Sequence, residues 1–125
     1  MNTMQLRIVV AGAFFLLIFL SGFWLSRAGE PHNNLLITAH KLIALGALVY
    51  LFVVFRQANR ADALSAGAWI LAVVTGLLFV GAIVSGGLVS IDRPWPAVVP
   101  LLHKVAPYLT ALATAVTVYL VMRAT

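Results

Sequence analysis

The chain has 125 residues, of which 63% are hydrophobic and only 9% are charged, so it lacks the polar surface of a soluble domain. Its mean hydropathy of +1.08 is typical of an integral membrane protein. The few charged residues lie near the ends of apolar runs, so the net charge of +5 indicates the lipid bilayer and its anionic headgroups as partner, with no nucleic acid.

Four apolar runs follow in chain order, at 8–26, 35–55, 63–91 and 97–122. About 20 residues cross the hydrocarbon core of a bilayer, so each run predicts one transmembrane helix. The predicted connections are short, at 27–34, 57–62 and 92–96, and short connections make neighbouring helices antiparallel. We therefore predict an all-α integral membrane protein: a four-transmembrane-helix up-down-up-down bundle forming one transmembrane domain over 1–125, with both termini on one side.

The chain also contains an internal repeat, whose halves are about 8–56 and 72–123. A shift of 63 or 64 residues aligns ten identities: Val9/Val73, Val10/Val74, Gly12/Gly76, Phe15/Phe79, Ser21/Ser85, Gly22/Gly86, Ser26/Ser90, Pro31/Pro94, His40/His103 and Lys41/Lys104. Chance similarity of two apolar hairpins explains poorly why Gly, Pro, Ser, His and Lys are among them. Two hairpins of equal orientation are related by a pseudo-two-fold axis along the membrane normal. The second and fourth helices then lie diagonally, with their histidines at equal depth.

His40 and His103 interrupt otherwise apolar helices, and an ionisable side chain within a membrane span is a functional hypothesis. Each lies five or six residues into its run, so roughly 8 Å from its end, in one leaflet. Zinc needs further ligands, and the spans contain no Cys, Asp or Glu. Non-haem iron in bundles needs carboxylates. Haem needs only two axial ligands, and the diagonal of a bundle has room for it.

Small and polar residues accompany the two histidines. Gly22 and Gly86 are expected at the histidine depth, where they would let a flat porphyrin lie against the backbone, although small residues also favour plain helix packing. Ser21 and Ser85 could accept from the imidazole N–H, which fixes the ligating tautomer, or could bond their own backbone. All four are therefore candidate cofactor-binding residues.

Lys41 and Lys104 follow the histidines directly, and their stems can extend to the nearby interface. Their expected partners are haem propionates, which Arg27 and Arg93 could also bind, or lipid phosphates. His32 has no mate in the repeat and is interpreted as a solvated interface residue.

A four-helix bundle with paired inward histidines resembles the b-type membrane cytochromes, which carry electrons through haem ligated by helix histidines. The resemblance rests on His40, His103 and the glycines Gly22 and Gly86. It implies one haem b, with both histidines as metal ligands, and electron transfer to a redox partner protein or a quinone. Many such cytochromes hold two haems on four histidines, whereas this chain has one pair, which suits relay near one surface.

Two other functions stay open on the sequence. Each histidine could ligate the magnesium of a chlorophyll-type pigment, which predicts two macrocycles instead of one. Alternatively, the chain is a cofactor-free assembly subunit or small transporter, although no span carries the carboxylate that proton-coupled transport usually needs. No nucleophile–base pair, phosphate loop or acidic dyad is visible, so a non-catalytic carrier or a subunit of a larger redox complex is favoured over an enzyme.

The distribution of arginine gives an expected orientation. Arg7, Arg56, Arg60 and Arg123 lie on the side of the termini, whereas the loops of the opposite side carry Arg27 and Arg93. Because cytoplasmic loops are enriched in Lys and Arg, this count of four against two predicts cytoplasmic termini, with the chain in a bacterial inner membrane, although counting Lys41 and Lys104 makes the two sides equal. A homo-oligomer and a place in a larger complex are both compatible with the sequence.

Overall fold

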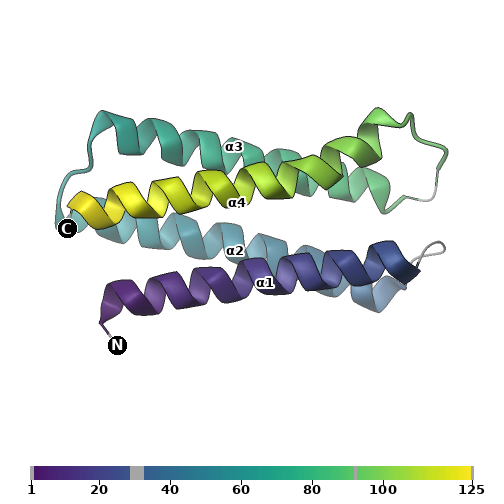
Figure 1. The fold of residues 1–125 in the computed structure, drawn as a ribbon, viewed down its shortest axis with the longest axis horizontal. Helices are drawn as coiled ribbons and strands as arrows, with labels where there is room; N and C mark the ends of the chain where they lie inside the picture. The colour runs from purple at the N-terminus through teal and green to yellow at the C-terminus, as the bar shows by residue number, and fades with distance from the viewer. Residues whose placement is uncertain (1, 29–32, 92, 125) are drawn as a thin grey trace.

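The computed structural model describes residues 2–28, 33–91 and 93–124, the last three of these as backbone. Four helices account for nearly all of it: α1 (Thr3–Ala28), α2 (Asn34–Ala61), α3 (Ala66–Val89) and α4 (Val98–Ala124). Each is long and apolar enough to cross a membrane. The four helices lie side by side, and both chain ends lie at the same end of the bundle (Figure 1). The predicted all-α four-helix membrane bundle is confirmed.

The ends of the helices differ from the ends of the apolar runs. The predicted connection at 57–62 is wrong, because α2 continues to Ala61 and the turn comprises residues 62–65. Asp62 is extended, which ends α2, and the side chain of Ser65 accepts from Ala68 N, which begins α3. A helix ends where its hydrogen bonds are capped, whereas apolarity reports only the part that crosses lipid. Asn33 caps α2 in the same way, accepting from the backbone N–H groups of two residues in the first turn.

The bundle consists of two helical hairpins, α1 with α2 and α3 with α4, which pack more extensively within themselves than against each other. Smaller contacts between α2 and α3 and between α1 and α4 close the ring, which leaves α2 and α4 on one diagonal. The rings of Phe15 and Phe79 meet with their centroids 5.7 Å apart, and those of His40 and His103 lie 6.3 Å apart. Both are repeat mates, and residues that meet their own mates lie beside the axis that relates the halves.

Small and hydroxyl-bearing side chains make up most of the core, together with Ile18, Leu64, Phe79 and Val121, whereas most large apolar side chains face outward, as is usual where lipid surrounds the helices. Ala47 and Thr110 are only 1% and 2% exposed, whereas Phe52 and Leu77 are 60% and 67% exposed. The buried threonine hydroxyls donate to carbonyls one turn earlier in their own helices, so the core contains hydroxyl oxygens without unpaired donors.

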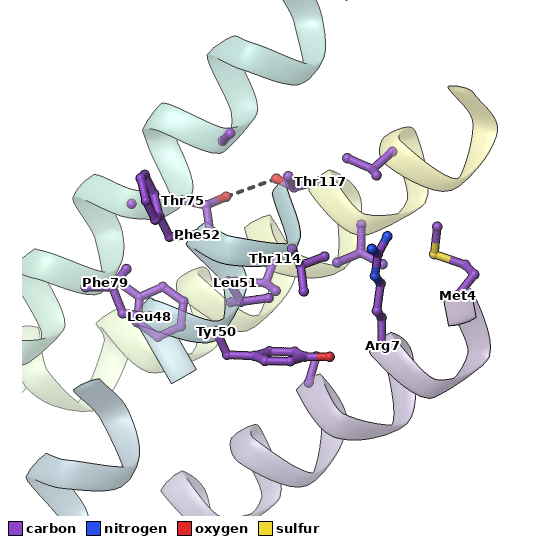
Figure 2. A pocket seen from close by; sticks show the side chains of 16 residues that line it. Met4, Arg7, Leu48, Tyr50, Leu51, Phe52, Thr75, Phe79, Thr114 and Thr117 are labelled. Atoms are coloured by element: carbon purple, nitrogen blue, oxygen red, sulfur yellow. Dashed lines mark hydrogen bonds between the residues drawn. The ribbon is translucent and has the colours of Figure 1, made fainter. Parts of the chain in front are cut away.

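A cavity of about 120 Å³ lies in the half of the bundle nearer the termini, and all four helices line it (Figure 2). Its wall is mostly apolar, with Tyr50 and Arg7 on one side and the hydroxyls of Thr75 and Thr117, 3.0 Å apart, on another. The Phe79 ring also lines it, so the aromatic pair with Phe15 lies between this cavity and the histidines.

Candidate histidine site

The two histidines meet near the end of the bundle that is opposite the termini. His40 lies six residues after the start of α2 and His103 five residues after the start of α4, so both are in the second turn of their helices. Both side chains are half-buried, their ring centroids are 6.3 Å apart, and the ring planes are perpendicular. Of the residues predicted for the site, these two are brought together directly, across the diagonal of the bundle.

In the first hairpin, Ser21 of α1 holds the His40 ring. The Ser21 hydroxyl donates to the carbonyl of Leu17 at 2.7 Å, with the Ile18 carbonyl at 3.1 Å, and its oxygen lies 2.7 Å from His40 Nδ1. A hydroxyl has one hydrogen, and here that hydrogen is used within α1. With that hydrogen engaged in α1, the compatible tautomer of His40 has Nδ1–H as the donor to Ser21 and the lone pair on Nε2.

The second hairpin repeats this arrangement and adds a contact. Ser85 Oγ lies 3.2 Å from His103 Nδ1 and donates to the carbonyl of Ala82 at 3.1 Å. The same Ala82 oxygen lies 3.1 Å from His103 Nδ1. A carbonyl can only accept, so Nδ1 of His103 must carry the proton. Both imidazoles thus have the tautomer that presents an Nε2 lone pair, as metal-ligating histidines do.

Gly22 and Gly86 allow the imidazoles to lie against the neighbouring helix. A Cβ on Gly86 would lie 2.7 Å from Cε1 of His103, and one on Gly22 would lie 3.1 Å from Cε1 of His40. The glycines do lie at the histidine depth. In the structure the atoms nearest to them are those of the imidazole rings, so close packing of these rings already requires glycine at both positions. The expected contact with a porphyrin would be additional to this packing.

The two lysines behave differently. Both side chains are exposed, but Lys41 Nζ donates to Ser90 Oγ at 2.9 Å and so joins α2 to the end of α3, whereas Lys104 has no such bond to a described residue. The guanidinium of Arg27 lies over the ring of Phe23 and that of Arg93 over Trp95. His32 lies outside the described residues, and so does the side chain of Arg123.

The donor set fits a metal that brings most of its own ligands. Within 2–28, 33–91 and 93–124, no three His, Cys, Asp or Glu side chains lie together, so a metal held by protein ligands alone has no described site. Two metal–imidazole bonds of about 2 Å each, with a ring radius of about 1 Å at either end, span about 6 Å. The observed centroid separation of 6.3 Å matches that span. The separation therefore suits one metal with one nitrogen from each ring, which is the pair of protein ligands that a haem needs.

Several contacts of the site and the core were not predicted. The Ala82 carbonyl carries no signal in the sequence, because any helical residue has one. The sequence did not indicate the contact between Lys41 and Ser90 either. The internal repeat would lead one to expect the same bond between their repeat mates, Lys104 and Ser26, but the described residues show no such bond. The buried threonines that line the cavity are Thr75, Thr114 and Thr117, and they would have been found only by asking which hydroxyls share a helix face, as Thr114 and Thr117 do on α4.

Ser21→Ala is expected to destabilise the bundle more than Ser85→Ala. Without Ser21, the Nδ1–H of His40 loses its one described partner, which costs about 1 kcal/mol of the free energy of unfolding. Without Ser85, His103 still donates to the Ala82 carbonyl. Reversible unfolding of the detergent-solubilised chain measures the difference. Ser26→Ala, an exposed serine of α1, is the matched control, and equal losses in all three variants would contradict the assignment.

Comparison with family models, with curated proteins and with solved structures gives no match to this chain.

Proposed function

We propose that this chain is a b-type membrane cytochrome, which binds one haem b between His40 and His103 and transfers electrons to a redox partner protein or a quinone. The observation that carries the proposal is the pair of imidazoles from diagonal helices, 6.3 Å apart, each protonated at Nδ1 by the pattern of its hydrogen bonds. Bound haem would supply one-electron chemistry, with its iron alternating between the ferric and ferrous states.

The protein's own contribution is to hold the two rings in place. Ser21 orients His40, and Ser85 with the Ala82 carbonyl orients His103. These hydrogen bonds favour the metal-ligating tautomer of each ring before a metal binds. The glycines opposite the rings remove side-chain bulk where α1 and α3 approach them. Such a pre-set donor pair lowers the entropic cost of ligation.

An electron carrier agrees better with this donor set than an enzyme does. If His40 and His103 both ligated one haem, no coordination position would be left for a substrate. One site in one leaflet also favours relay to a partner at that surface, or to a quinone in the membrane, over transfer across the whole bilayer. The arginines at the opposite end, Arg7, Arg56 and Arg60, support cytoplasmic termini in a bacterial inner membrane, with the histidine site toward the other face.

A cofactor-free role is the second candidate, and one contact favours it. The bond from His103 to the Ala82 carbonyl joins α4 to α3, so the histidines could act as polar links between helices. A chlorophyll-type pigment on each histidine agrees less well, because a 6.3 Å separation spans one metal and leaves no space for two macrocycles between the rings.

An absorption spectrum of the detergent-purified chain, produced with a haem supplement and recorded before and after dithionite, tests these functions. We expect one haem per chain, a sharp Soret band, and narrow α and β bands on reduction. A red-absorbing spectrum without a redox response would instead support a pigment protein. A chain that contains no chromophore after haem supplementation would overturn the cytochrome proposal and favour the cofactor-free role.

A further inference from the structure

A groove on the outside of the bundle combines arginines with aromatic side chains. It lies at the end nearer the termini, where the late turns of α2 meet the first turn of α3. Six residues line it: Phe52, Phe55, Arg56, Asn59, Arg60 and Trp69. The groove lies far from the histidines, since more than ten helical residues of α2 separate Phe52 from His40.

The aromatic residues form the apolar part of this groove. The rings of Phe55 and Trp69 pack edge to face with centroids 4.8 Å apart, which joins α2 to α3. The Arg56 guanidinium lies over the Phe52 ring, 5.8 Å from its centroid. Phe52 and Trp69 stay 60% and 46% exposed, so this surface is open to a hydrocarbon chain from the bilayer.

The charged part of the groove carries positive charge that no described carboxylate neutralises. Arg56 and Arg60 are four residues apart, so they lie on one face of α2. In the described ranges neither forms an ion pair, and Asp62, the nearest described acid along the chain, ends α2 through its backbone. The first turn of α3, beginning at Ala66, adds the partial positive charge of a helix N-terminus.

The depth of the groove indicates what it meets. The apolar run of α2 ends at Phe55, and Arg56 follows directly, so its guanidinium lies at the boundary between hydrocarbon and headgroups. Trp69 belongs to the same level, where tryptophan is enriched. A ligand that satisfies both parts of the groove must carry an anion at headgroup depth and an apolar chain below it.

We propose that this groove binds an anionic phospholipid, with the guanidinium groups of Arg56 and Arg60 donating to its phosphate and an acyl chain lying against Phe52 and Trp69. Arginine presents a planar fork that matches phosphate oxygens, and basic pockets between transmembrane helices suit such headgroups. This site is independent of the histidine pair, so it stands or falls separately from the cytochrome proposal.

Native mass spectrometry of the detergent-solubilised chain, titrated with phosphatidylglycerol or with phosphatidylcholine of the same acyl chains, tests the proposal. Each arginine that meets the bound headgroup contributes about a fivefold change in affinity, so Arg56→Gln with Arg60→Gln should weaken phosphatidylglycerol binding about 30-fold. The control is Arg27→Gln with Arg93→Gln, which removes two charges and two arginine–aromatic contacts at the other end of the bundle. This control should bind like the unaltered chain.

Other outcomes would overturn the proposal. Equal weakening in the control would mean that net charge alone attracts the lipid, and equal binding of both lipids would mean that the arginines do not select for charge. Inorganic phosphate that binds as tightly as the lipid would identify a site for free anions. Arg56→Lys with Arg60→Lys keeps the charge and should bind phosphatidylglycerol with intermediate affinity, which keeps the test valid if the glutamine variant does not fold.

Discussion

Replacing either His40 or His103 by alanine is expected to remove the bound chromophore completely. Loss of a group that only orients a metal ligand already costs about 10–100-fold in metal affinity, so loss of a ligand itself should cost at least as much. The remaining histidine keeps its own serine but offers one nitrogen instead of two. The measurement is the Soret absorbance per chain after purification under identical conditions.

His32→Ala is the matched control, because it removes the third histidine of the chain, which lies outside the apolar runs that carry His40 and His103. It should retain the full absorbance. Chromophore retained by both single variants and lost only in the double variant would mean that one nitrogen is sufficient. Chromophore retained even in the double variant would place the ligands elsewhere and contradict the assignment.

Gly86→Ala is expected to lower the free energy of unfolding by about 1–2 kcal/mol. The added Cβ would lie 2.7 Å from Cε1 of His103, and the ring cannot simply rotate away because Ser85 and the Ala82 carbonyl both hold its Nδ1. Overpacking of this kind costs about 1–3 kcal/mol, and the better helix propensity of alanine offsets up to about 1 kcal/mol. Reversible unfolding in mixed micelles measures the net effect.

Two other glycine-to-alanine variants serve as comparisons for the free energy of unfolding of Gly86→Ala. Gly22→Ala should cost less, because its Cβ would lie 3.1 Å from Cε1 of His40 rather than 2.7 Å. Gly87→Ala should be neutral or slightly stabilising, since no neighbouring atom lies within 4 Å of its Cβ position. If Gly86→Ala were as stable as Gly87→Ala, the close approach of His103 to α3 would not exist in solution.

The sequence predicted the architecture because lipid imposes a simple rule: a long apolar run must become a helix. This rule does not predict where a helix ends. Residues 57–61 are too polar to be predicted as part of a membrane span, yet they continue α2 until Asp62. The histidine pair was predictable because the repeat relates the two residues and the bundle then brings them together. The hydrogen-bond partner of each imidazole was harder to predict, because Ser21 and Ser85 could equally have bonded only their own helices.

The reason for the glycines shows what a single sequence lacks. Their depth follows from counting residues along α1 and α3, but the neighbour that each one faces depends on helix rotation, which counting does not provide. The cavity was missed for the same reason. Thr75 and Thr117 resemble ordinary packing residues until α3 and α4 lie side by side with their hydroxyls 3.0 Å apart.

The contacts between repeat mates along the axis, such as His40 with His103, suggest how such a histidine site can be assembled from two similar hairpins. A hairpin in which serine, glycine and histidine already fit together is half of a binding site, and two identical copies that dimerise about a two-fold axis complete it. His40 with Ser21 and His103 with Ser85 are such halves, joined in one chain. Joining the halves in one chain allows them to differ: among the described residues, His103 but not His40 bonds a carbonyl of the neighbouring helix, and Lys41 but not Lys104 bonds a residue of the other hairpin. In physical terms, the chain holds two similar hairpins about one axis, and these unequal contacts make the two halves of the histidine site different.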